Sequence, residues 1–90
     1  ELFDLPPAIN AELWALAYAL GPALKREFGG DKLNYGALGN VVSQLHLHVI
    51  VRQVGDPGWP SPVWGRNEPE LTRESAAERL LRLQHCLRVL

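Results

Sequence analysis

Apolar and polar side chains alternate most regularly in the stretch from Ser43 to Arg52. A period of two predicts a β-strand with two different faces, here from about residue 42 to residue 54. The first face carries Leu45, Leu47, Val49 and Val51, and the second carries Gln44, His46, His48, Ile50 and Arg52. Same-face neighbours on a strand lie roughly 7 Å apart. The strand is therefore expected to hold two imidazole groups side by side, backed by an apolar face.

A second apolar pattern, with three- and four-residue spacing, predicts a long helix from about residue 8 to residue 28. Its expected buried stripe is Leu13, Ala17, Leu20, Leu24 and Phe28. Asp4 is the expected N-terminal cap, and Gly29 with Gly30 supplies the left-handed stop. Pro22 removes a backbone hydrogen bond and crowds the preceding turn, so we expect a kink or a restart there.

The last part of the chain predicts another helix, from about residue 72 to residue 89, capped by Thr72 or Ser75. Its expected buried stripe is Ala76, Leu80, Leu83, Leu87 and Leu90. Other side chains of this helix are expected outside the stripe, facing solvent: Arg79, Arg82, His85 and Arg88. Cys86 is expected to pack inertly near the stripe.

The connecting segments carry less regular patterns. Residues 32–35 predict a short strand, and residues 36–40 predict a turn of small residues. Residues 55–65 contain three prolines and three glycines, which predicts a loop. Its two indole side chains, Trp59 and Trp64, need a surface to pack against. Residues 67–70 predict a second polar link.

These elements, two strands and two helices, predict an α+β fold. Two strands with a single apolar face are seldom stable by themselves. Both helices and the strand at residues 42–54 have apolar faces, and a sheet of two strands is too small to bury all of them. We therefore expect that further strands precede Glu1 in the natural protein, or that another chain supplies them.

Composition narrows the class of protein. A chain of 90 residues forms at most one small domain, and a net charge of -1 argues against strong attraction to nucleic acid. Cys86 is the single cysteine, so we expect neither an internal disulfide nor a zinc site built on cysteine pairs. No apolar run approaches the roughly 20 residues of a membrane span. The segment from Glu1 lacks the basic start of a secretory signal, and these features together predict a cytoplasmic protein.

The two histidines allow three interpretations. The first is an exposed strand on which His46 and His48 have no special role. The second is a metal site, but a histidine pair needs a third and usually a fourth ligand, and His85 and Cys86 lie on a distant helix. The third is covalent catalysis, in which one neutral imidazole attacks phosphorus and the other donates a hydrogen bond to the anion or leaving oxygen.

Residues 44–50, Gln-Leu-His-Leu-His-Val-Ile, resemble the histidine triad motif, His-φ-His-φ-His-φ-φ with φ apolar. This is the motif of the HIT family of nucleotide hydrolases and transferases. Residues 31–34 and 38–42 are similar to the strand and phosphate loop that precede the motif in that family. Residues 56–60 and 62–65 are similar to the loop that follows it in a bacterial subgroup. The resemblance covers about residues 2–65, and Gln44 stands at the place of the first histidine.

The resemblance implies a role for several residues. His46 matches the nucleophile that forms a nucleotidyl-histidine intermediate, and His48 matches the histidine that hydrogen-bonds the phosphate region. The implied substrate-binding residues are Asn34, Gly39, Asn40 and Gln44. The resemblance also implies a HIT-type sheet with the long helix across one face, a homodimer, and catalysis without a metal or another cofactor. Strands that form the nucleoside pocket in the family have no counterpart in this chain.

We therefore expect a nucleotidyl hydrolase or transferase that cleaves a nucleoside phosphate derivative, such as a dinucleoside polyphosphate or a phosphoramidate. The alternative is a nucleotide-binding or interaction module without catalysis, which Gln44 and the missing strands favour. A metal-binding strand is the third possibility.

Overall fold

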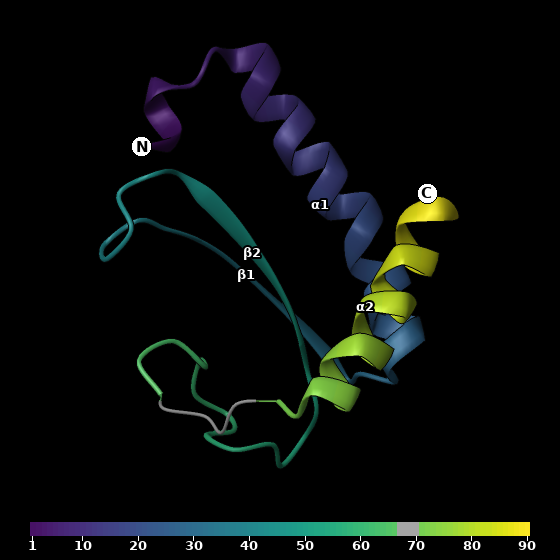
Figure 1. Cartoon of the computed structure of the whole chain (residues 1–90). Coiled ribbons are helices and arrows are strands. Elements are labelled where there is room, and N and C mark those ends of the chain that lie inside the picture. Colours follow the sequence, from purple (N-terminus) through teal and green to yellow (C-terminus); the bar gives the residue numbers. More distant parts are fainter. Residues whose placement is uncertain (67–70) are drawn as a thin grey trace.

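The computed structural model describes residues 1–66 and 71–90. In chain order its elements are η1 (Leu2–Asp4), α1 (Pro7–Phe28), β1 (Lys32–Leu38), β2 (His46–Arg52) and α2 (Arg73–Arg88). The two strands form an antiparallel hairpin, which confirms the α+β class (Figure 1). In Figure 1 the hairpin lies between α1 and the loop that follows β2. The polar link predicted at residues 67–70 lies outside the described residues.

Helix α1 follows the predicted stripe, with Ala17 and Leu24 buried and Phe28 half-buried. It ends as predicted, because Gly29 has φ 64° and its amide donates to the carbonyl of Lys25. One expectation is wrong. Asp4 belongs to η1 and does not cap α1, whose N-cap is Pro6. Of the two outcomes expected at Pro22, a restart does not occur, because the helix continues through Pro22 as one element.

The hairpin differs from the prediction at its ends. Strand β1 continues to Leu38, three residues beyond its expected end at Tyr35 and into the expected turn, and β2 covers only His46–Arg52. The register pairs Lys32 with Arg52 at one end and Leu38 with His46 at the other. The small residues of β1 have weak strand propensity, and their pairing with β2 decides their conformation.

The two faces of β2 are as predicted. Val49 and Val51 pack against the core cluster of Ala23, Leu24 and Cys86, which α1 and α2 supply. Because successive side chains of a strand alternate, His46, His48 and Arg52 point away from α1. Cross-strand partners share a face, so Asn34 and Gly36 of β1 lie on the histidine face as well.

The predicted stripe of α2 is wrong. Thr72 does cap the helix, accepting a hydrogen bond from the Ser75 amide at 3.1 Å. However, Cys86 is the buried residue of the helix, and every member of the predicted stripe is exposed: Ala76, Leu80, Leu83, Leu87 and Leu90.

The face of α2 that meets α1 is partly polar. Arg82, expected in solvent, forms an ion pair with Glu27 at 3.0 Å, and its guanidinium lies 4.5 Å from the centroid of the Phe28 ring. The helix meets only the C-terminal half of α1 (Figure 1). A two-stranded sheet offers no second apolar wall, so the leucines stay exposed.

Candidate functional site

The histidine face of β2 carries the candidate site. The ring centroids of His46 and His48 lie 4.8 Å apart, with their planes at 65°. The side chain of His46 is exposed and that of His48 is half-buried. The pleat of the strand thus brings the two imidazoles to one face, as their spacing in the sequence predicted, and the two rings are in edge contact.

A backbone hydrogen bond orients the His46 ring. Its Nδ1 lies 2.7 Å from the carbonyl oxygen of Gln44. A carbonyl oxygen can only accept, so Nδ1 must be the protonated nitrogen. In the neutral ring, Nε2 then holds the free lone pair. Gln44 contributes to the site through its backbone in this structure, and its side chain is exposed.

His48 is held differently. Its ring makes an edge contact with the indole of Trp64, with centroids 5.6 Å apart and planes at 86°. Its Nε2 is buried and has no hydrogen-bond partner among the described residues. Aromatic neighbours surround this ring, whereas a carbonyl holds the ring of His46.

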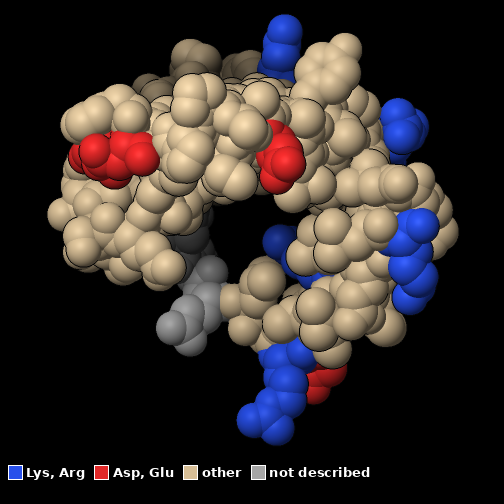
Figure 2. Space-filling view, turned by 90° about the horizontal axis from the view of Figure 1, so that it is seen from above, with Lys and Arg blue, Asp and Glu red and all other residues tan. Residues whose placement is uncertain are grey.

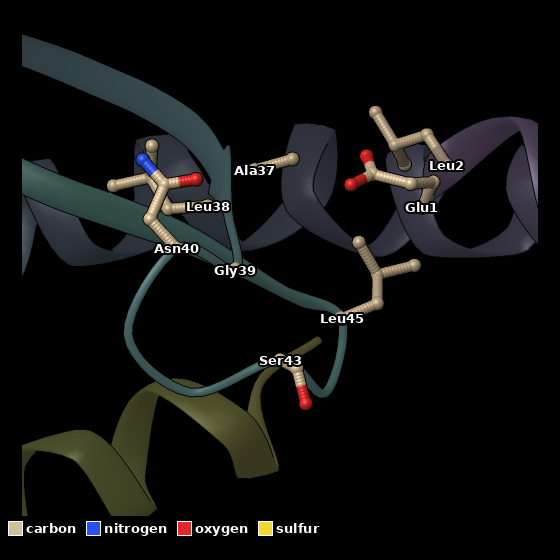
Figure 3. Close-up of a pocket in the computed structure, with 8 residues that line it drawn as sticks. All are labelled: Glu1, Leu2, Ala37, Leu38, Gly39, Asn40, Ser43 and Leu45. Atoms are coloured by element: carbon tan, nitrogen blue, oxygen red, sulfur yellow. The ribbon is translucent and has the colours of Figure 1, made fainter.

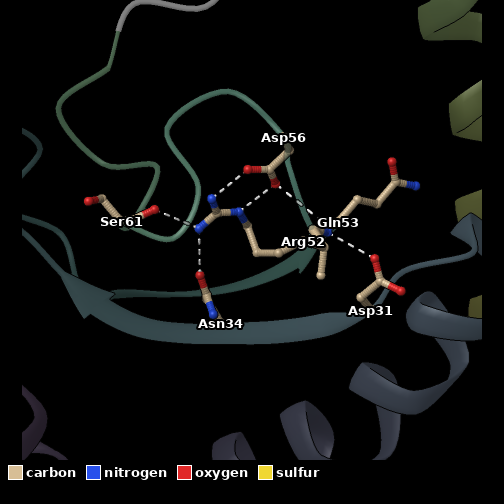
Figure 4. A network of polar contacts seen from close by, with 7 residues as sticks. Asp31, Asn34, Arg52, Gln53, Asp56 and Ser61 are labelled. Atoms are coloured by element: carbon tan, nitrogen blue, oxygen red, sulfur yellow. Dashed lines mark hydrogen bonds and ion pairs between the residues drawn. The ribbon is translucent and has the colours of Figure 1, made fainter.

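The other end of the same face holds a polar network around Arg52 (Figure 4). Arg52 is 1% exposed. Its Nε and Nη2 donate to the two carboxylate oxygens of Asp56 at 2.7 and 2.6 Å. Its Nη1 donates to Asn34 Oδ1 and to the carbonyl of Ser61, both at 2.9 Å. Arg52 is therefore not a solvated cation at the end of the strand, because the loop after β2 folds back over it.

The network perturbs both charged groups. The hydrogen bond from Arg52 holds the pKa of the Asp56 carboxyl below its ordinary value of 3.8, although burial acts in the opposite direction. The same hydrogen bond raises the pKa of Arg52. Asp56 and Arg52 therefore both remain charged across the physiological range.

Two predicted substrate-binding residues, Gly39 and Asn40, line a cavity of about 90 Å³ at the tip of the hairpin (Figure 3). The cavity wall consists of Glu1, Leu2, Ala37, Leu38, Gly39, Asn40, Ser43 and Leu45. His46 and His48 are not among these lining residues. Leu38 is the cross-strand partner of His46, so the loop begins beside that histidine.

Asn34, the third predicted ligand, lies apart from Gly39 and Asn40, in the middle of β1. Its side-chain oxygen is occupied by Arg52. The structure thus divides the predicted residues among three places on the hairpin: the histidine pair with Gln44, the tip, and the Arg52 network. The sequence prediction missed Gly36, Arg52 and Trp64. The signal was available at Gly36, since a glycine inside a strand often marks the close approach of another group.

In the space-filling view the molecule is hollowed at its centre, and Lys and Arg side chains are spread over the top, right and lower sides of the view (Figure 2). Among residues 1–66 and 71–90, no three His, Cys, Asp or Glu side chains lie together as a metal site. None of the helices described is long and apolar enough to cross a membrane.

A histidine pair on a hairpin, backed by a long helix, defines the class of domain, and comparison with known proteins gives the family. The model of the HIT domain matches residues 1–55. The chain therefore belongs to the HIT family, as residues 44–50 indicated. No curated protein matches the chain closely enough to indicate a relationship.

Solved structures of histidine triad proteins are similar to this chain. One from Marinobacter aquaeolei VT8 is 46% identical, with a TM-score of 0.91, over 100% of this chain and 66% of that protein. One from Sinorhizobium meliloti 1021 is 42% identical, with a TM-score of 0.84, over 94% of this chain and 64% of that protein. One from Bradyrhizobium japonicum is 38% identical, with a TM-score of 0.82 and the same coverage, 94% and 64%. The chain spans about two thirds of the length of these relatives.

Proposed function

We propose that the protein is a nucleotidyl hydrolase or transferase that works through a nucleotidyl-histidine intermediate on His46. Its substrates would be nucleoside phosphate derivatives of the dinucleoside polyphosphate or phosphoramidate type. The observation that carries the proposal is the orientation of His46. The ring is exposed, and the bond from Nδ1 to the Gln44 carbonyl leaves Nε2 as the free nucleophilic atom.

The reaction divides one displacement into two. In the first step the Nε2 lone pair forms an N–P bond, and the bond from phosphorus to the leaving group breaks. The leaving group departs with the electron pair and takes up a proton. In the second step water attacks phosphorus and loses a proton to solvent, the N–P bond breaks, and neutral His46 and a nucleoside monophosphate result.

Other residues of the hairpin support the phosphate in this proposal. His48 hydrogen-bonds a phosphate or leaving-group oxygen. Gly39 and Asn40 approach the anion from the hairpin tip, which begins beside His46. Asn34 would use its amide nitrogen, since its oxygen accepts from Arg52.

Trapping the adduct tests the proposal. The chain is incubated with an α-phosphate-labelled dinucleoside polyphosphate, quenched, and analysed for an acid-labile nucleotide attached to His46. We expect the adduct in the parent and in His48→Ala at a reduced level, and none in His46→Ala. An adduct that persists in His46→Ala would refute the assignment. Turnover that vanishes with a chelator and returns with zinc would favour a metal mechanism instead.

Two observations favour a second candidate, a nucleotide-binding module without catalysis. The buried Nε2 of His48 has no free surface for a phosphate oxygen, and Gln44 stands where the family motif has a histidine. Calorimetric binding of a nucleotide, with no product after hours of incubation, would support this candidate.

We also propose a cytoplasmic homodimer. The hairpin leaves both of its outer strand edges unpaired within the described chain, and α2 exposes several leucines. Sedimentation equilibrium measures the assembly, and a monomer at all concentrations would contradict it.

A further inference from the structure

Trp64 is the aromatic residue of the loop after β2 that reaches the candidate site. Its indole contacts His48 edge to face, with centroids 5.6 Å apart. The rings of His46 and His48 are themselves in edge contact at 4.8 Å. His48 therefore has an aromatic ring along its own strand and another from the loop. Such edge contacts restrict ring rotation, although none of the described residues fixes this imidazole by a hydrogen bond.

Gly36 makes the contact possible. It is the cross-strand partner of His48, so a side chain at position 36 would stand directly beside the imidazole. An added Cβ there would lie 2.8 Å from Cη2 of Trp64 and 2.9 Å from its Cζ2. No real Cβ makes contacts this short with a ring that is held in place. The indole thus occupies the space of the missing side chain at position 36.

The Arg52 network holds the loop that carries Trp64. Arg52 binds Asp56 at the start of the loop and the Ser61 carbonyl further along it. Its guanidinium also lies 5.4 Å from the centroid of the Trp59 ring. Three points of the loop are thus tied to the buried end of β2. The loop returns over the histidine face from that anchor and brings Trp64 to His48.

We infer that Trp64 is a positioning residue for His48, seated by Gly36 and anchored through Arg52, and that it fixes the orientation of the imidazole. The inference rests on the proposed function for its catalytic consequence. Trp64 takes no part in bond formation. Its effect on catalysis passes entirely through the orientation of the His48 ring.

The first test measures ring orientation without any substrate. Three-bond couplings across χ1 of His48 are recorded by NMR on the labelled chain. We expect single-rotamer values in the parent and in Trp64→Phe, and averaged values in Trp64→Ala. Gly36→Ala keeps the indole but displaces it, so it should resemble Trp64→Ala. Trp14→Phe, on α1, is the control for loss of an indole and should match the parent.

The second test is a double-mutant cycle on kcat/KM for the proposed nucleotide substrate. Trp64→Ala should lower kcat/KM by about ten- to hundredfold, because small misplacements of a catalytic group cost this much. Trp64→Phe should restore most of the rate. In a His48→Ala background, Trp64→Ala should not lower kcat/KM further, because Trp64 acts only through the His48 ring that is already missing.

The outcomes separate the two proposals. An unchanged single rotamer of His48 in both Trp64→Ala and Gly36→Ala would overturn the positioning role, whether or not the parent is active. So would equal losses of kcat/KM from Trp64→Ala in the presence and absence of His48. A parent chain that forms no adduct, but shows the expected rotamer changes, would count against the proposed function and leave the positioning of the ring established.

Discussion

The two ends of strand β2 carry polar residues on the same face, but these residues differ in burial and in hydrogen bonding. At the C-terminal end, Arg52 is 1% exposed and its guanidinium donates to three different residues. At the N-terminal end, His46 is exposed and has its one hydrogen bond from Nδ1 to a backbone carbonyl. His48 lies between them, half-buried, with an unpartnered Nε2.

Burial and hydrogen bonding along β2 therefore distinguish polar groups that stabilise the fold from polar groups that can react with a ligand. A buried cation is tolerated when its donors are paired, and the four hydrogen bonds of Arg52 use four of its five N–H donors, which leaves little capacity for a ligand. A group whose reactive atom is unpaired retains that capacity. The Arg52 end therefore holds the loop, and the histidine end is available for chemistry.

Loss of the His46 imidazole should have the largest effect. In His46→Gln, turnover should fall by at least about a thousandfold, because removing a covalent nucleophile eliminates the catalysed pathway. The midpoint of thermal unfolding should stay close to that of the parent, since the side chain is exposed. Turnover is measured by an assay of product formed over time, and the midpoint of thermal unfolding is measured by circular dichroism. A large drop in the unfolding midpoint would show that His46 has a structural role.

Arg52→Leu tests the structural role of the polar network at the C-terminal end of β2. The substitution leaves the Asp56 carboxylate and the Asn34 oxygen without their partner, so the midpoint of thermal unfolding should fall by several degrees. Arg52→Lys should recover only part of the loss, because an ammonium cannot pair with both carboxylate oxygens as the guanidinium does. Full stability in Arg52→Leu would show that the network contributes nothing to the fold.

The Arg52–Asp56 pair should also give the fold a dependence on acidic pH. The pKa of Asp56 is lowered on folding, so its contribution to stability is present above the ordinary value of 3.8 and is lost as the pH falls through the lower folded pKa. Asp56→Asn removes this contribution at all pH values. The difference in unfolding free energy between parent and variant should therefore shrink as the pH falls below 3.8. A difference independent of pH would contradict the assignment.

The smallest structural effect is expected at Gly39. It is not among the glycines with positive φ, and an added Cβ would meet the carbonyl oxygens of Val42 and Ser43 at 3.6 and 3.7 Å, which are ordinary contacts. Gly39→Ala should therefore change the unfolding free energy by no more than about 0.5 kcal/mol. If the backbone approaches a phosphate there, KM should rise nonetheless. An unchanged KM would remove Gly39 from the proposed site.

The prediction from sequence succeeded for periodic features and failed for features that need a partner. The apolar stripe of α1, its stop at Gly29 and the two faces of β2 are all as expected, because each depends on local spacing. The leucine stripe of α2 was wrong, because burial needs an opposing surface and the hairpin supplies none. For the same reason Arg52 could not be assigned from its neighbours in the chain.

The same distinction between local pattern and tertiary contact applies to the candidate site. The sequence by itself placed His46 and His48 on one face of a strand, since the alternation of side chains is a property of the extended backbone. Only the tertiary structure decided what surrounds them. The bond from Arg52 to the Ser61 carbonyl ties the loop after β2 to the hairpin, and Gly36 leaves room for Trp64 beside His48. Such contacts depend on distances between segments that the order of residues does not specify.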